Sequence, residues 1–221
     1  MRQTAHKTII AALQRVRPTM VLGLALAVGS VSSAVASEKA RIKSRFTTVE
    51  LKSCAAVQPD SDPGPASSPT SARAWTCDGL SGYPVYVAEG DRHQFISFGP
   101  NANRRRAATQ TLKSANSVFT PDHSRATVEW RFRRRDGRDV PYATIMRFYT
   151  SSGSKGDVIR GDVLVVSKVT PTDACQVARI DALANPDAII IARSVADELS
   201  PTFDCRTDQL RVIGATGRSP M

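Results

Sequence analysis

Apolar and polar residues alternate along much of the chain after residue 45, and this period-two pattern predicts β-strands. The alternation is clear in residues 46–54, 72–79, 84–90 and 92–99, which are separated by turn-forming residues. The last two segments are expected to pair across a tight turn, with Gly90 supplying the unusual backbone angle that the turn needs.

A second hairpin is predicted at Asp136 and Gly137, because Asp-Gly between alternating segments is the strongest short signal for a hairpin turn. Folding the chain back at this turn gathers the apolar residues of both arms on one face. The expected cross-strand pairs are Val128 with Ile145, Trp130 with Ala143, and Phe132 with Pro141. The opposite face carries Glu129, Arg131 and Arg133 and is expected to meet solvent.

The hydrophobic pattern changes in the last third of the chain. Residues 162–170 are apolar on both faces, which predicts a central strand, and residues 173–184 predict a further strand. Residues 186–199 predict a helix, with Asn185 as its N-terminal cap and Pro201 beyond its end. Its apolar stripe at helical spacing consists of Ala188, Ile191, Ala192, Val195 and Leu199.

Residues 100–119 fit either a loop with a short helix or a loop with a ragged strand. The whole pattern predicts an α+β fold dominated by antiparallel β-structure. About eight strands would form a sandwich or a barrel-like body, with the helix at 186–199 near the C-terminus.

Residues 1–36 have the three-part pattern of a secretory signal peptide. A basic start is followed by an apolar run from Met20 and then by small residues at Ala34 and Ala36, which predicts cleavage after Ala36. An uncleaved anchor is the alternative, but the apolar run is short for a membrane-spanning helix. The mature protein is therefore expected to be periplasmic or secreted, with no stable membrane anchor after cleavage.

Charge limits the classes of partner. The chain has 30 Lys and Arg against 20 Asp and Glu. Four of the basic residues lie in the first 36, which leaves 26 against 20 and a net charge of +6 for the mature chain. This moderate excess, on an exported protein, argues against nucleic acid as a partner.

The mature chain, residues 37–221, is expected to be a single domain stabilised by disulfides. It holds all four cysteines, and we predict the sequence-local pairs Cys54–Cys77 and Cys175–Cys205. The first pair would close off a Pro- and Ser-rich loop at 57–72. A zinc site is the competing reading of the cysteines, but CxxC motifs are missing and the histidines are few.

Candidate catalytic chemistry is sparse. Ser152 and Lys155 match the short SxxK pattern of serine acyl-transfer enzymes, but they lie in a Ser/Gly loop without the partner motifs. His93 could act as a general base, yet no nucleophile is near it in the sequence. Three aspartates, Asp181, Asp197 and Asp204, could gather as carboxylates near the helix, but their positions at solvated helix and strand ends explain them without a catalytic role. We therefore predict no catalytic, cofactor or metal site.

Arginines provide the one candidate binding site. Guanidinium groups suit phosphates and carboxylates, which are abundant in lipid headgroups, lipopolysaccharide and peptidoglycan. The alternative, which we favour from the sequence, is an ordinary charged hairpin face that discourages edge pairing. The candidate anion-binding residues are Arg131, Arg133, Arg134, Arg135 and Arg138 on the hairpin, and Arg104, Arg105 and Arg106 before it.

The segments WTCDG, YPVYVAEGD, FISFG, VEWRFR, ATIMRFY, VLVVSKV and CQVARIDALANPDA together resemble a group of small exported bacterial proteins of uncharacterised function. WTCDG at the start of a β-rich exported domain is also similar to periplasmic inhibitors of C-type lysozyme. Their SGxxY-type inhibitory loop is matched only by LSGYP at 80–84, which falls too early in the strand order.

The sequence thus predicts a non-catalytic binding or structural domain of the cell envelope, whose ligand would be an anionic envelope component if the arginines form a binding site. The alternatives are an inhibitor of a cell-wall lytic enzyme, with that enzyme as its partner, and an unrecognised periplasmic hydrolase.

Overall fold

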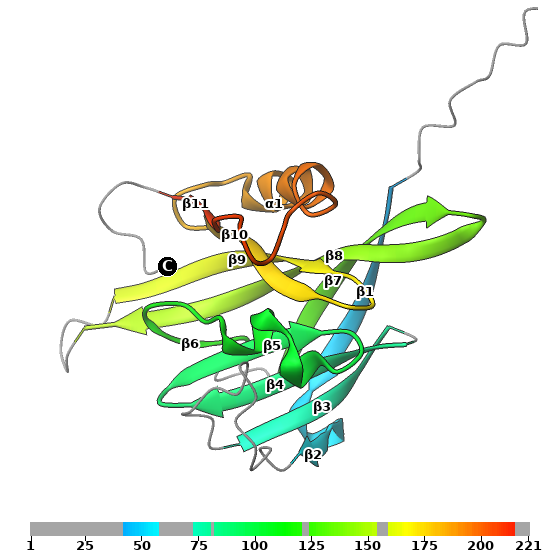
Figure 1. The fold of residues 1–221 in the computed structure, drawn as a ribbon. Coiled ribbons are helices and arrows are strands. Elements are labelled where there is room, and N and C mark those ends of the chain that lie inside the picture. Colours follow the sequence, from blue (N-terminus) through cyan, green and yellow to red (C-terminus); the bar gives the residue numbers. More distant parts are fainter. Residues whose placement is uncertain (1–41, 58–72, 81, 121–123, 154–158, 215–221) are drawn as a thin grey trace, which may run out of the picture. The chain divides into compact units, whose positions relative to one another are not determined.

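A computed structural model describes residues 42–57, 73–80, 82–120, 124–153 and 159–214 (Figure 1). The predicted signal peptide at 1–36 and nearly all of the predicted Pro- and Ser-rich loop at 57–72 lie outside these ranges. Lys155 of the SxxK pattern lies outside them as well.

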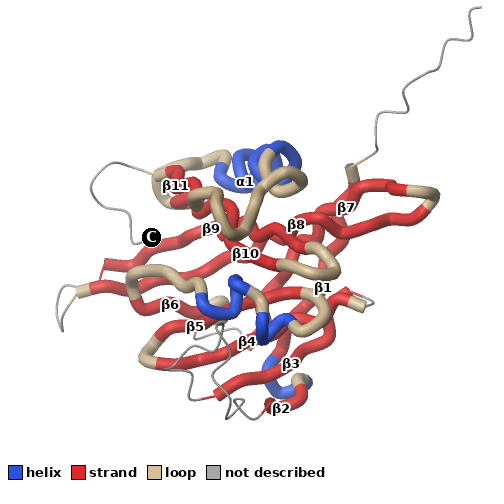
Figure 2. The backbone as a smooth tube through the Cα atoms, viewed as in Figure 1, coloured by secondary structure: helices blue, strands red, loops and turns tan. Residues whose placement is uncertain are grey.

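The described residues form eleven strands in two sheets, with one α-helix near the C-terminus (Figures 1 and 2). The larger sheet has the order β1-β7-β8-β9-β10-β11, with β6 also paired to β8, and only β10 and β11 run parallel. Its strands are β1 (Lys43–Glu50), β6 (Ala115–Ser117), β7 (Arg125–Arg135), β8 (Arg138–Ser152), β9 (Ile159–Val169), β10 (Ala174–Asp181) and β11 (Arg211–Ile213). The predicted α+β class with mainly antiparallel strands is confirmed.

The smaller sheet has the order β2-β3-β4-β5 and is antiparallel throughout. Its strands are β2 (Ala55–Val57), β3 (Arg73–Leu80), β4 (Tyr83–Gly90) and β5 (His93–Phe98). A short 3-10 turn, Leu51–Ser53, ends the first predicted strand early and leads the chain from one sheet to the other.

The prediction for the turn between β4 and β5 was wrong in one respect. The residues with positive φ are Asp91, at 46°, and Arg92, at 60°, and not Gly90. Gly90 pairs with His93, so the loop has two residues, and both need the left-handed conformation of a type I′ turn. Arginine is a costly residue there, because a side chain in this region is disfavoured by about 1–2 kcal/mol.

Trp130 is at the centre of the main core, between the two sheets. It is fully buried, with edge-on contacts to Phe98 at 5.6 Å and Tyr83 at 6.4 Å between ring centroids. Its indole Nε1 donates to Thr47 Oγ1 at 2.8 Å, which satisfies its only polar atom. The small sheet approaches so closely that a Cβ at Gly79 would lie 3.1 Å from the Trp130 ring.

The second face of the larger sheet is covered by α1 (Ala188–Glu198). The predicted stripe is confirmed: Ala188, Ala192 and Val195 are buried, and Ile191 and Leu199 pack at its margin. Asn185 is not the cap. Asp187 holds that position without a side-chain cap bond, while Asn185 Nδ2 donates back to the carbonyl of Asp181 at 2.8 Å.

The β7–β8 register agrees with the prediction near the turn and then shifts by one residue. Phe132 faces Pro141 as expected, but a β-bulge follows, and the next pair is Arg131 with Ala143. Trp130 therefore faces Thr144, not Ala143, and Val128 faces Met146, not Ile145. The extra residue is Tyr142, which joins Ala143 in the cluster packed under α1. A bulge re-aims side chains in this way, and a proline in a strand favours one.

Residues 100–119 combine both alternatives that the sequence left open. Two short 3-10 turns, Ala102–Arg104 and Arg106–Thr109, are followed by the short strand β6. The strands predicted at 162–170 and 173–184 are confirmed as β9 and β10, and both are largely buried.

All four cysteines are paired as predicted, Cys54 with Cys77 and Cys175 with Cys205. The first bond holds the crossover between the two sheets, and the second ties β10 to the segment after α1. Two disulfides favour an oxidising extracytoplasmic environment. Among the described residues, no helix has the length and apolar character needed to cross a membrane.

Replacing Cys175 and Cys205 by serine should lower the free energy of unfolding by about 3–4 kcal/mol, because the bond closes a loop with a sequence separation of 30. Urea denaturation of the oxidised wild type and the double variant measures the difference. A loss below about 1 kcal/mol would contradict this chain-entropy account.

Candidate functional site

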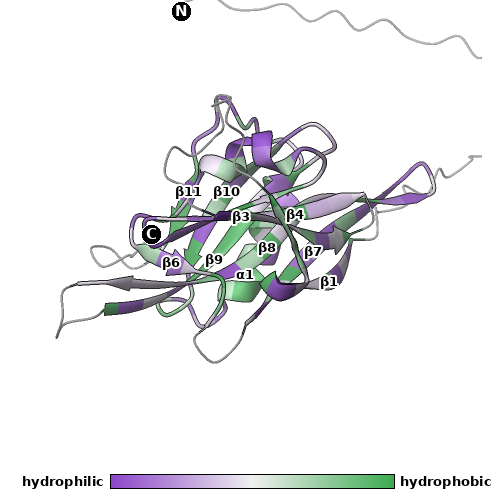
Figure 3. Cartoon of the chain, turned by 90° about the horizontal axis from the view of Figure 1, so that it is seen from below, coloured by the Kyte–Doolittle hydropathy of each residue, from purple (hydrophilic) through white to green (hydrophobic). Residues whose placement is uncertain are grey.

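The tip of the β7–β8 hairpin, residues 133–140, extends beyond the strands on either side of it; we call it the basic hairpin. On one side, β1 reaches only as far as the pair of Lys43 with Phe132. On the other side, β9 ends opposite Ala143. Within the described part of the chain, residues of the tip therefore pair in the sheet only with each other. The tip stands out in Figure 1 and is strongly hydrophilic in Figure 3.

Positive charge is concentrated around one carboxylate of the basic hairpin. Asp139 accepts from Arg45 Nη2 at 3.0 Å, and Lys43 Nζ and Arg134 Nη1 lie 3.7 Å from it. Asp136 is the only other acidic residue of the tip. The region therefore has six positive charges and two negative ones. The cations are Lys43, Arg45, Arg133, Arg134, Arg135 and Arg138.

The arginines of this region differ in how firmly they are held. Arg133 lies over the Tyr142 ring, 4.9 Å from its centroid, and Arg45 lies over the Phe132 ring at 5.0 Å. The side chain of Arg134 is 53% exposed. Arg135 and Arg138 are exposed, and the side chain of neither has a hydrogen-bond or ion-pair partner among the described residues. The tip thus presents guanidinium groups that the fold itself does not use.

Arg131, predicted to face solvent with this group, is instead buried beneath α1, with 9% of its surface exposed. Its guanidinium makes a bidentate pair with Asp197 of the helix, with Nε to Oδ1 at 3.0 Å and Nη2 to Oδ2 at 2.6 Å. The prediction failed because the helix covers this face of the sheet. Arg131 is therefore structural and is not available to a ligand.

Further polar groups join this pair in what we call the helix–sheet ionic network. Glu129 is 4% exposed and accepts from Arg193 Nε at 2.8 Å and from Ser44 Oγ at 2.6 Å. Ser44 also accepts from Arg131 Nη1 at 2.5 Å. The network consists of Ser44, Glu129, Arg131, Tyr142, Arg193 and Asp197, and it joins β1, β7 and β8 to α1.

Burial and the contact with Asp197 determine the direction in which the pKa values of Tyr142 and Arg131 are shifted. Burial, reinforced by its hydrogen bond to Asp197, raises the pKa of Tyr142 far above its ordinary value. The Tyr142 hydroxyl donates to Asp197 Oδ1 at 2.5 Å. Burial disfavours the charge of Arg131, but the hydrogen bond and charge of Asp197 outweigh it and raise the pKa of Arg131.

The second predicted arginine group has mainly structural contacts. Arg105 donates to the carbonyls of Pro100, at 3.1 Å, and of Thr172. Arg106 donates to the carbonyl of Cys205. These bonds fasten the 3-10 turns to the loop before β10 and to the segment that carries the second disulfide. Arg104 lines the same cleft as Arg105 and Arg106, apart from the basic hairpin.

The remaining chemical candidates are dispersed. Asp181 accepts from the backbone N–H groups of Leu183 and Ala184, Asp197 belongs to the ionic network, and Asp204 binds the N–H of Arg206. Among the described residues, no group of three or more His, Cys, Asp or Glu side chains could hold a metal ion.

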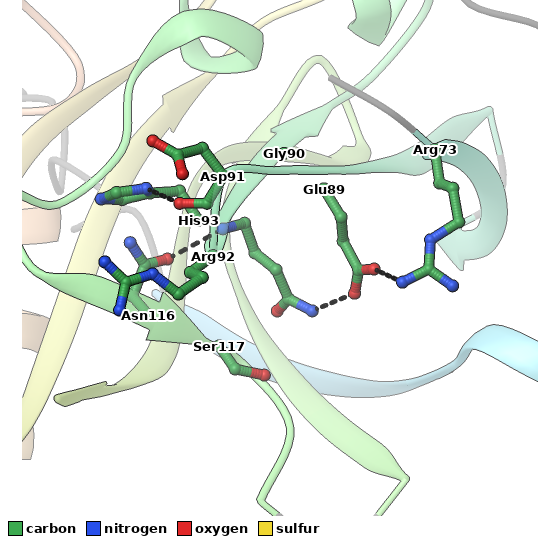
Figure 4. Close-up of a pocket in the computed structure, with 9 residues that line it drawn as sticks. Arg73, Glu89, Gly90, Asp91, Arg92, His93, Asn116 and Ser117 are labelled. Atoms are coloured by element: carbon green, nitrogen blue, oxygen red, sulfur yellow. Dashed lines mark hydrogen bonds and ion pairs between the residues drawn. The ribbon is translucent and has the colours of Figure 1, made fainter. Parts of the chain in front are cut away.

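Sequence reasoning missed a polar cleft beside the β4–β5 turn (Figure 4). A line of hydrogen bonds crosses it: Arg73 donates to Glu89 at 2.9 Å, Gln94 Nε2 donates to Glu89 at 2.6 Å, and Asn116 Oδ1 accepts from Gln94 N at 3.2 Å. His93 also lies here, with Nδ1 2.7 Å from the carbonyl of Asp91. Residues 89–94, around the β4–β5 turn, form one side of this cleft, but Arg73, Asn116 and Ser117 join them from segments distant in sequence, so no local pattern marks the complete cleft.

Comparisons with protein-family models, with curated proteins and with solved structures found no match for this chain. Function is therefore inferred from the chain's own geometry.

Replacing Asp197 by asparagine should lower the free energy of unfolding by about 2–4 kcal/mol, because the buried Arg131 loses the carboxylate of its bidentate pair and keeps as counter-charge only Glu129, 3.5 Å away and shared with Arg193. Glu198→Gln is the matched control, since Glu198 is the next residue of α1 and is hydrogen-bonded only locally, to Ser194. The control should change stability by less than about 0.5 kcal/mol. Equal losses for the two variants, in urea denaturation, would show that the network contributes little.

Tyr142 should make the protein less stable in alkali. A raised pKa in the folded state means that the unfolded chain loses the tyrosine proton first, so stability falls as pH rises above about 10. Tyr142→Phe removes this dependence. The stability difference between wild type and Tyr142→Phe should therefore shrink by up to about 1.4 kcal/mol per pH unit above pH 10, measured by urea denaturation. If the free energy of unfolding depended on pH in the same way for both proteins, the alkaline loss of stability could not be assigned to Tyr142.

Proposed function

We propose that this protein is an extracytoplasmic, non-catalytic binding domain that holds an anionic component of the cell envelope through the basic hairpin. The observation that carries the proposal is the group of guanidiniums at the hairpin tip that the fold leaves unused. Arg135 and Arg138 are without partners among the described residues, and Arg134 shares Asp139 with two other cations.

Arginine suits this role because its planar guanidinium binds phosphate or carboxylate oxygens in pairs. Its charge is also permanent over the physiological range of pH. Lys43 and Arg45 from β1 extend the positive surface beside the tip, and the rings of Phe132 and Tyr142 hold Arg45 and Arg133 at its base. The surface is thus partly organised before any ligand binds, which reduces the entropy lost on binding.

An extracytoplasmic location is supported by the two disulfides and by the signal-like pattern of residues 1–36. In the periplasm or outside the cell, phosphates of lipid headgroups and carboxylates of the cell wall are abundant anions. The position of the charges at a projecting tip allows contact with an extended surface, which a recessed patch would not.

A charged tip that only discourages edge-to-edge pairing is the simpler explanation. One or two charges suffice for that purpose, whereas this region has six cations, three of them within 4 Å of the single carboxylate of Asp139. Like charges this close repel one another, so the cluster has an electrostatic cost that binding to an anion would relieve.

A second candidate, inhibition of a cell-wall lytic enzyme, is favoured by the same projecting hairpin. A narrow tip of two paired strands can enter an active-site cleft, and its arginines would meet catalytic carboxylates there. This reading predicts saturable inhibition of such an enzyme and no affinity for anionic vesicles.

Binding to vesicles made of equal parts phosphatidylglycerol and phosphatidylcholine tests the proposal. The triple variant Arg134→Ala, Arg135→Ala, Arg138→Ala should bind on the order of 100-fold more weakly than wild type, since each arginine near an anionic surface contributes about 1 kcal/mol. Sedimentation with the vesicles measures the affinity, and binding should weaken as salt is raised.

The matched control removes three exposed cations elsewhere: Lys52→Ala, Arg206→Ala, Arg211→Ala. It has the same net charge as the hairpin variant, so it separates a local site from general attraction. An equal loss of affinity in both triple variants, or binding that is indifferent to salt, would overturn the proposal.

A further inference from the structure

We propose that the groove beside the β4–β5 turn binds a small organic oxyanion, a carboxylate or a phosphate monoester attached to a ring or an aliphatic body. The groove consists of two adjoining clefts of about 370 and 800 Å³. The residues that line both are Glu89, Arg92, Gln94, Asn116 and Ser117. The larger volume is in the range of pockets that hold small molecules.

The groove begins where the apolar core between the two sheets ends. Phe148 of β8 faces Val163 of β9, and both are buried in the main core. Two residues further along, Thr150 faces Gly161, which has no side chain to fill the space. Both Thr150 and Gly161 line the larger cleft.

The groove has a rigid polar floor. Gln94 and Asn116 are 5% and 6% exposed. The Gln94 side chain donates to Glu89 (Figure 4). It also accepts from the N–H of Val118 at 2.7 Å, and Asn116 Nδ2 donates to Thr111 Oγ1 at 2.9 Å. Because these amides are held by internal bonds, they shape the groove and leave recognition to other groups.

The polar groups of the groove that have hydrogen-bonding capacity not used among the described residues are donors. Thr150 is 4% exposed, and its hydroxyl has no partner among the described residues. The guanidiniums of Arg92 and Arg160, from the β4–β5 turn and from β9, have no partner there either. Ser117 Oγ accepts from the N–H of Phe119 at 2.9 Å, so its own hydrogen remains to be donated. Unused donors of this kind favour an anionic ligand.

The acidic groups of the groove do not cancel this preference. Glu89 is already bound by Arg73 and Gln94. Asp91 lines only the smaller cleft and does not line the larger one, where Arg92, Thr150 and Arg160 lie. An apolar wall, formed by Phe119 and the partly exposed Tyr149, is suited to the uncharged body of the ligand.

The backbone of Arg92 supports a role for its side chain. Its φ of 60° lies in the left-handed region, where glycine would be the unstrained choice in a type I′ turn. A strained residue of this kind is typical of ligand sites, where the side chain compensates for the backbone cost. The geometry of the turn does not explain why an arginine occupies position 92.

This site is separate from the basic hairpin. Arg138 and Thr150 stand near opposite ends of β8, twelve residues apart, which corresponds to about 40 Å along an extended strand. The groove is thus independent of the proposed surface binding, and each can fail in experiment without the other.

The oxidised, full-length mature chain should bind phenyl phosphate or benzoate, measured by isothermal titration calorimetry, and should not bind neutral benzyl alcohol. Preference for phenyl phosphate identifies a phosphate site, and preference for benzoate identifies a carboxylate site. Arg92→Gly should weaken binding of the preferred probe at least tenfold and yet leave the melting temperature unchanged or raised, because glycine relieves the strained turn. Arg160→Ala should weaken binding as well.

Asp91→Gly is the matched control, since it relieves the same turn but keeps Arg92. It should bind the probe at least as tightly as wild type. Binding of benzyl alcohol equal to that of the anions, or unchanged binding in Arg92→Gly, would overturn the proposal. Loss of probe binding in the hairpin triple variant would also overturn it, because that result would move the site to the hairpin.

Discussion

The bidentate pair between Arg131 and Asp197 is the contact on which the arrangement of the larger sheet and its helix depends. It lies under α1 with little exposure, and Tyr142 donates to the same carboxylate. A buried charge pair tolerates little displacement, because each partner left alone would carry a large desolvation cost. The β-bulge that turns Tyr142 toward the helix is therefore part of the same interaction.

This interaction also divides the arginines of the chain by role. Arg131 is committed to the helix, and Arg105 and Arg106 bind backbone carbonyls that hold loops together. Beyond Phe132, where the neighbouring strands have ended, the exposed guanidinium groups of Arg135 and Arg138 have no partners among the described residues. The proposed binding surface is thus a consequence of strand length: the hairpin continues after its neighbours stop, and its charges stay in solvent.

Much of the fold could be predicted because its signals are local. Alternation identified the strands, the Asp136–Gly137 turn identified the hairpin, and the apolar stripe identified α1. The pairing of the cysteines followed from their closeness in sequence. Errors arose where two local solutions compete: Asp91 and Arg92 adopt the left-handed angles in place of Gly90. The register shifted because a single bulged residue breaks strict alternation, although Pro141 was a signal that could have suggested it.

The sequence by itself determined the class of fold, the positions of most strands, the helix and both disulfides, since periodicity and chain closeness act over short distances. Tertiary structure alone decided that the polar face of the β7–β8 hairpin is buried as well as the apolar one, because the helix that covers it begins more than fifty residues after β7. It also decided the polar groove, where Arg92 of the β4–β5 turn meets Asn116, Thr150 and Arg160 from three different strands. Alternation of apolar and polar residues distinguishes the two faces of a strand. Which elements pack against each face depends on segments that are distant in sequence.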